Sequence, residues 1–106
     1  MKPLFALLFF LSANLYADDI APARQNEIIH LLKHDCGACH GITLKGGLGP
    51  PLLPDTLTAK PKAFLRYTIL EGRPGTAMPP WQDFLTQTEV DWLVERLLHG
   101  IDDAPH

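Results

Sequence analysis

The sequence predicts an all-α protein with a single small domain. In three segments, apolar side chains recur at the three- and four-residue spacing of amphipathic helices, and no segment alternates apolar and polar residues as a half-buried strand would. The stretches between these segments are rich in glycine and proline, which exclude regular helices and central strands. We therefore expect short helices joined by irregular loops.

Residues 1–17 have the pattern of a secretory signal peptide. Lys2 precedes an apolar stretch, and a short polar stretch follows that ends at Ala17. We expect cleavage after Ala17, export to the periplasm and a mature domain over residues 18–106. Leu15 stands three residues before the expected cut, where a small residue is usual, and its size leaves the exact cleavage site open. An uncleaved anchor is the alternative, but the apolar stretch is shorter than the ~20 residues that cross a bilayer. We expect no stable membrane insertion after cleavage.

The first predicted helix covers residues 22–34, where an apolar stripe lies between polar side chains. The second covers residues 61–71, with Pro61 in its first turn and Gly72 as its stop. Two loops rich in glycine and proline separate the helices, over residues 41–54 and 73–81. The first loop carries apolar side chains that are unusual on a solvated loop and that we expect to lie against a bound group: Leu44, Leu48, Leu52 and Leu53.

The last helix is predicted to begin after Thr86. Thr86 and Glu89 have the spacing of a capping box, in which each side chain binds a free backbone N–H group of the other residue. Gly100 ends the pattern. The apolar residues that repeat at helical spacing and predict the buried face are Val90, Leu93, Val94, Leu97 and Leu98.

Cys36, Cys39 and His40 form a C-x-x-C-H motif, the strongest chemical signal in the chain. Two thiols one helical turn apart can bond to both vinyl groups of a haem, and the adjacent histidine can bind the iron as an axial ligand. The motif occurs once, so we expect one covalent haem c. A buried haem would also supply apolar surface to a core that is small for independent stability.

The same two cysteines allow other interpretations. A structural disulfide and a redox dithiol both use this spacing, but a thioredoxin-like dithiol follows a strand, and no strand pattern precedes Cys36. A zinc site needs four ligands, and the chain has only 2 cysteines. The histidine directly after Cys39 favours haem over each of these.

Met78 is the predicted second axial ligand. It is the only methionine outside the signal peptide and lies between Gly75 and two prolines, which can hold its thioether in place with little loss of entropy. A methionine is otherwise common as core filler. The competing ligands are histidines close to the motif, on helix flanks or in the terminal tail: His30, His34, His99 and His106.

Charge excludes some partners. The chain has 12 acidic and 9 basic residues, and cleavage would remove Lys2 from the basic group. An acidic mature protein is not suited to bind nucleic acid or an anionic membrane. The charge does not choose among protein partners; a haem-bearing chain would have redox partner proteins, and we expect a monomer.

These motifs together resemble class I cytochromes c. The resemblance rests on the residues 36–40, 49–52 and 78–81 and on flanking N- and C-terminal helices. The longer strings 41–51 and 70–81 are similar to the small periplasmic cytochromes c-55X associated with cd-type nitrite reductase. The resemblance implies a class I cytochrome c fold, with short helices and long loops wrapped around one haem.

The resemblance also implies roles for two further residues. The carbonyl of Pro50 would accept the Nδ1 proton of His40, although Pro50 is equally explained as a turn residue. Trp81 would lie in the haem pocket near a propionate, with core packing as its alternative role.

For function, the resemblance implies a one-electron carrier that delivers electrons to cd-type nitrite reductase in denitrification. With His40 and Met78 on the iron, no coordination position is open to a substrate, so we expect an electron-transfer protein and not an enzyme. An accessory role in haem d maturation or reductase assembly is the alternative. A sensor or peroxidase would instead need an open iron.

Overall fold

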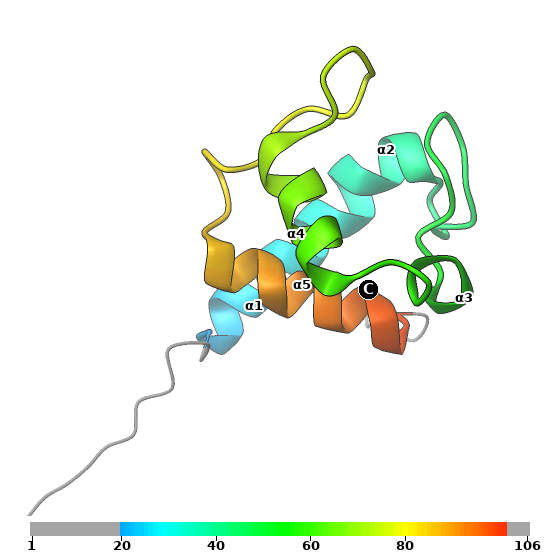
Figure 1. Ribbon diagram of the computed structural model, residues 1–106. Helices are drawn as coiled ribbons and strands as arrows, with labels where there is room; N and C mark the ends of the chain where they lie inside the picture. Colours follow the sequence, from blue (N-terminus) through cyan, green and yellow to red (C-terminus); the bar gives the residue numbers. More distant parts are fainter. Residues whose placement is uncertain (1–19, 102–106) are drawn as a thin grey trace, which may run out of the picture.

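The computed structural model describes residues 20–101, which form an all-α domain and contain no strand (Figure 1). The fold class predicted from the sequence is therefore confirmed. The predicted signal peptide lies outside the described residues. No helix within residues 20–101 is long and apolar enough to span a membrane. The helical elements are α1 (Pro22–Leu31), η1 (Leu32–Cys36), α2 (Gly37–His40), α3 (Pro54–Leu57), α4 (Lys62–Glu71) and α5 (Gln87–His99).

The helices α1, η1 and α2 follow one another without a break. The sequence pattern predicts an end near residue 34, but the helical backbone continues through the motif and stops at Gly41, whose φ of 96° suits glycine. In the π-helical turn η1, the backbone N–H group of Gly37 donates to the carbonyl of Leu32, five residues earlier. Both cysteines of the motif thus belong to this continuous helical segment.

Helix α5 lies at the centre of the domain and contacts α1, α3 and α4. Its predicted capping box is present: Thr86 Oγ1 accepts from the N–H group of Glu89, and Glu89 Oε1 accepts from that of Thr86. Gly100 follows its last turn with a φ of 95°, as the sequence predicts.

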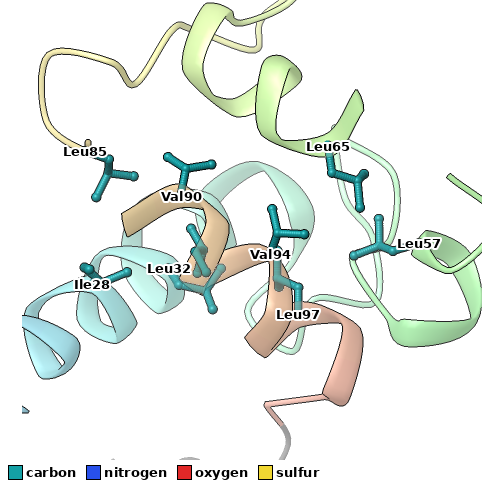
Figure 2. Packing of buried hydrophobic residues seen from close by; sticks show 9 residues of the cluster. Ile28, Leu32, Leu57, Leu65, Leu85, Val90, Val94 and Leu97 are labelled. Carbon is teal, nitrogen blue, oxygen red and sulfur yellow. The ribbon is translucent and has the colours of Figure 1, made fainter. Parts of the chain in front are cut away.

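The hydrophobic core forms around α5, with buried side chains from α1, η1, α3 and α4 (Figure 2). Four of the five apolar residues predicted on α5 are buried, and Leu98 is half-buried. Side chains of the first and last helices both belong to this core. The core therefore holds in place the helices between which the two loops run. Its buried residues are Ile28, Leu32, Leu57, Leu65, Leu85, Val90, Leu93, Val94 and Leu97.

An ion pair connects α1 to the start of α5. Arg24 binds both carboxylate oxygens of Glu89, with Nε–Oε2 and Nη2–Oε1 distances of 2.7 and 3.0 Å. Arg24 Nη2 also donates to the carbonyl of Phe84 at 2.8 Å. The hydrogen bonds from Arg24 hold the pKa of Glu89 below its usual value. The guanidinium therefore joins the two helices and the turn that precedes α5.

Helix α4 has the predicted position, with Pro61 as its N-cap residue and Gly72 as its C-cap residue. The second loop follows it and is closed by backbone hydrogen bonds at both ends: Arg73 donates to Met78, and Trp81 donates to Ile69 on α4. In Figure 1 this loop lies at the same upper side of the view as α2.

Candidate functional site

Both cysteines of the motif are free thiols and are half-buried. Cys36 ends η1, while Cys39 and His40 form the end of α2. The continuous helix therefore presents the three side chains within little more than one turn. This arrangement gives two thiols and an imidazole on one rigid element.

Burial raises the pKa of the Cys36 thiol to about 11, and the charges of Asp35 and Cys39 add to the effect. At neutral pH, Cys36 is thus a protonated thiol and not an activated nucleophile. Catalytic dithiols show the opposite shift. Within residues 20–101, no three residues among histidine, cysteine, aspartate and glutamate are clustered to hold a metal ion. Burial of the Cys36 thiol thus gives no support to the redox dithiol, and the described residues offer no ligand cluster that supports the zinc interpretation.

The loop after α2 folds back onto the carbonyl groups at the end of this helix. Gly41, Gly46 and Gly49 donate from their backbone N–H groups to the carbonyls of Gly37, His40 and Cys39, at 2.9, 2.8 and 2.7 Å. The bond from Gly41 to Gly37 is the last helical one, whereas the carbonyls of Cys39 and His40 have no partner further along the helix and are bound by the returning loop. The loop thus acts as a C-terminal cap built from backbone alone.

Glycine is needed for this close approach. A Cβ atom on Gly41 would lie 2.6 Å from the carbonyl oxygen of Gly46, and one on Gly49 would lie 2.7 Å from Cε1 of His40. Both distances are shorter than a non-bonded contact allows. The glycines in residues 41–49 predict a loop from the sequence, and the close approach of Gly41 and Gly49 to their neighbours follows only from the folded structure.

The folded-back loop brings the carbonyl of Pro50 to the ring of His40. The Nδ1–O distance is 2.7 Å. A carbonyl oxygen can only accept, so Nδ1 carries the proton and the lone pair is on Nε2. The contact implied for Pro50 is therefore present, and it leaves one nitrogen of His40 free to bind a metal.

Met78 is half-buried in the second loop. Its carbonyl accepts from Arg73, and its N–H group donates to Thr76 Oγ1 at 3.2 Å. A Cβ atom on Gly72 would lie 2.8 Å from the Met78 carbonyl oxygen, so this turn also requires glycine. The backbone around Met78 is held by these contacts, with no helix involved.

The competing histidines within residues 20–101 lie on helices and not in the loop that carries Met78. His30 and His34 are exposed on α1 and η1, where their rings lie in contact and are tilted relative to each other. His99 is bound through Nδ1 to the carbonyl of Glu95 in the last turn of α5. His106 lies outside the described residues. The aromatic candidate Trp81 is half-buried, packs against the core and lies near the ring of Phe84, with 5.6 Å between ring centroids.

These residues fit a covalently bound haem. Cys36 and Cys39 are unpaired, His40 has its free nitrogen on the ring edge opposite the Pro50 contact, and Met78 supplies a soft thioether from a second loop. The Nδ1 contact is the outer hydrogen bond that orients histidine ligands in metal sites generally. Leu44 and Leu52 pack against the core, whereas Leu48 of the same loop is 89% exposed on the protein alone.

The sequence matches the family described as "Cytochrome C oxidase, cbb3-type, subunit III" over residues 23–95. It is also similar to proteins named cytochrome c55X. That of Pseudomonas aeruginosa is 52% identical over 77 residues, which are 73% of this chain and 65% of the relative, so the chain spans just under two thirds of that protein. That of Paracoccus denitrificans is 41% identical over 98 residues, 92% of this chain and 95% of the relative.

Two solved structures are similar in fold. The structure titled c-type cytochrome NirC has a TM-score of 0.74 and 49% identity, covering 76% of this chain and 94% of that one. Dihydro-heme d1 dehydrogenase NirN in complex with DHE has a TM-score of 0.63 and 37% identity, covering 74% of this chain and 17% of that one. The second similarity therefore concerns a small part of a longer protein.

Proposed function

Because this chain belongs to the cytochrome c55X group of the c-type cytochromes, we propose that it is a periplasmic, monomeric carrier of single electrons with one haem c. The observation that carries the proposal is the hydrogen bond between His40 Nδ1 and the Pro50 carbonyl. It holds the imidazole of a C-x-x-C-H motif in the tautomer that an iron ligand needs.

In this proposal, the thiols of Cys36 and Cys39 attach the haem covalently, and His40 and Met78 bind its iron. Haem held in this way supplies an iron that changes between the ferric and ferrous states. Pro50 would orient His40, and Trp81 would lie in the haem pocket near a propionate. The Met78 thioether is a soft ligand that favours the ferrous state and raises the reduction potential.

The ligand set also decides between classes of function. His40 and Met78 would together hold the iron, so the side chains would leave a substrate no place at the metal. An electron carrier needs no such place, because its partner only has to approach the haem edge briefly. The proposed role is therefore electron transfer and not catalysis.

We further propose that the electron acceptor is a cd-type nitrite reductase. The test is a stopped-flow mixture of reduced holoprotein with oxidised reductase, in which both haem spectra are followed over a range of salt concentrations. Fast and saturable transfer is the expected result, with a salt dependence that reports on the docking charges. Transfer too slow to sustain nitrite turnover, from protein with an intact spectrum, would exclude this partner.

A second candidate function is a role in the maturation of haem d. It is favoured by the similarity to a protein named dihydro-heme d1 dehydrogenase of Pseudomonas aeruginosa, which is 37% identical over 98 residues, 92% of this chain and 20% of that protein. Deletion of the gene separates the two roles. A reductase purified without haem d would support maturation, while a fully loaded reductase that lacks electrons would support delivery.

A further inference from the structure

His30 and His34 form a pair that the proposed haem site does not use. His30 lies in the last turn of α1 and His34 in η1, and both side chains are exposed. The ring centroids are 4.1 Å apart, with an angle of 35° between the ring planes. Two exposed imidazoles in contact are therefore held on one face of a continuous helix.

This spacing is suited to chelate a metal ion. Two histidines four residues apart on a helix point in the same direction, as in the helical zinc motif H-E-x-x-H. The helix fixes both backbones before binding, so little conformational entropy is lost when the two rings turn toward one ion. The π-helical turn that contains His34 does not separate the rings.

The surroundings define what the pair would bind. Glu27 precedes His30 by three residues, but its carboxylate pairs with Arg24 at 3.0 Å. Within residues 20–101, no third histidine, cysteine, aspartate or glutamate is positioned to complete a metal cluster. Such a site has two nitrogen ligands, and water fills the other positions. This donor set suits borderline transition metals and does not suit Mg²⁺ or Ca²⁺, which prefer oxygen ligands.

We propose that His30 and His34 form a surface chelate site for a divalent transition metal ion. Cu²⁺ binds most tightly, and Ni²⁺ and Zn²⁺ bind more weakly, in the order general for nitrogen ligands. The bound ion bridges α1 and η1 and so stabilises the helix that carries Cys36. The proposal does not depend on the proposed function, because the binding of a metal ion to this pair can be measured whatever partner the protein has.

The test uses the oxidised, untagged mature holoprotein, in which both motif thiols are occupied by the haem. Isothermal titration with Cu²⁺ should show one site, and electron paramagnetic resonance should show copper with two nitrogen ligands. H30Q and H34Q should each weaken binding on the order of 100-fold, because either change removes the chelate. Thermal unfolding of the wild type should shift to higher temperature with added Cu²⁺.

H99Q is the matched control, since His99 is also exposed on a helix but its Nδ1 is bound to the carbonyl of Glu95. It should bind Cu²⁺ as the wild type does. Unchanged haem spectra and circular dichroism would show that all three variants are folded. Wild-type affinity in both H30Q and H34Q would overturn the proposal, as would equal losses in H99Q.

Discussion

His40 donates from Nδ1 to the carbonyl oxygen of Pro50, ten residues later in the chain, at a distance of 2.7 Å. The bond exists because the glycine-rich loop returns to the end of α2, where its N–H groups bind the carbonyls of the last helical turn. Helix capping and the orientation of the proposed iron ligand are therefore one structural arrangement. A substitution that moves this loop should therefore change the orientation of the His40 ring.

The first prediction concerns Gly49. In G49A, the new Cβ atom would lie 2.8 Å from Nδ1 of His40, so the ring or the loop must move and the Pro50 contact weakens. We expect the holoprotein to lose about 1–3 kcal/mol of its free energy of unfolding, as for other overpacked sites. Urea unfolding followed by the haem spectrum measures this loss.

G37A is the control for this experiment. A Cβ atom on Gly37 would meet its neighbours at 3.7 Å, which is an ordinary contact, and the position is helical. We expect stability equal to the wild type or up to about 1 kcal/mol higher, because alanine favours the helix. If both variants were equally stable, the close packing of Gly49 against His40 would be refuted.

The second prediction concerns the two thiols. Replacing both Cys36 and Cys39 by alanine should abolish covalent attachment, because no other cysteine exists in the chain. The denatured protein should then show no haem stain on an electrophoresis gel, while each single variant should keep at most one bond. Normal covalent haem in the double variant would contradict the proposed site.

The third prediction concerns Met78. M78A should lower the reduction potential, since the thioether no longer favours ferrous iron, and should open a coordination position. Carbon monoxide should then bind the ferrous protein readily, as shown by its visible spectrum. H34Q and H99Q should keep the wild-type spectrum. A change in either of these, with none in M78A, would identify a histidine as the second ligand.

The fourth prediction concerns pH. The pKa of Glu89 is lowered in the folded state, so the pair with Arg24 stabilises the protein fully above the unfolded pKa of about 4.3. This stability is lost as the pH falls through the lower folded-state pKa. E89Q should therefore be less stable than the wild type by about 1 kcal/mol at neutral pH, and the difference should shrink in acid.

Glutamine can still accept in the capping box, so E89Q tests the charge more than the cap. The measurement is chemical unfolding of both holoproteins at a series of pH values. E71Q, which changes an exposed carboxylate at the end of α4, serves as the control and should follow the wild type. A constant difference between E89Q and the wild type at every pH would contradict the role of the ion pair.

The elements predicted correctly from the sequence depend on residues that are near one another in the chain. Thr86 and Glu89 of the capping box are three positions apart, and Gly72 and Gly100 end their helices by their own backbone conformations. Such local effects can be recognised without knowing the fold. The apolar stripe of α5 likewise predicted its buried face, because helical periodicity alone determines which side chains share a side.

The sequence predicts the end of the first helix near residue 34, which is too early. The apolar residues at helical spacing end before the motif, so periodicity gives no sign that the helix continues. The helix nevertheless continues to His40, since its last carbonyls are bound by Gly46 and Gly49 from the returning loop. That support comes from residues up to ten positions away and depends on the path of the loop. Periodicity carries no information about it.

The all-α class, the caps of α4 and α5 and the residue types of the candidate site follow from the sequence alone, because helical periodicity, the capping residues and the motif at residues 36–40 are local features of the chain. Three findings needed the folded structure: the free nitrogen of His40, the need for glycine in the first loop, and the contact between His30 and His34. Each of these depends on contacts a few ångströms long between groups whose positions are set by the packed backbone. The residue types determine which atoms are able to form these contacts, and the packing of the backbone determines which of them come close enough to do so.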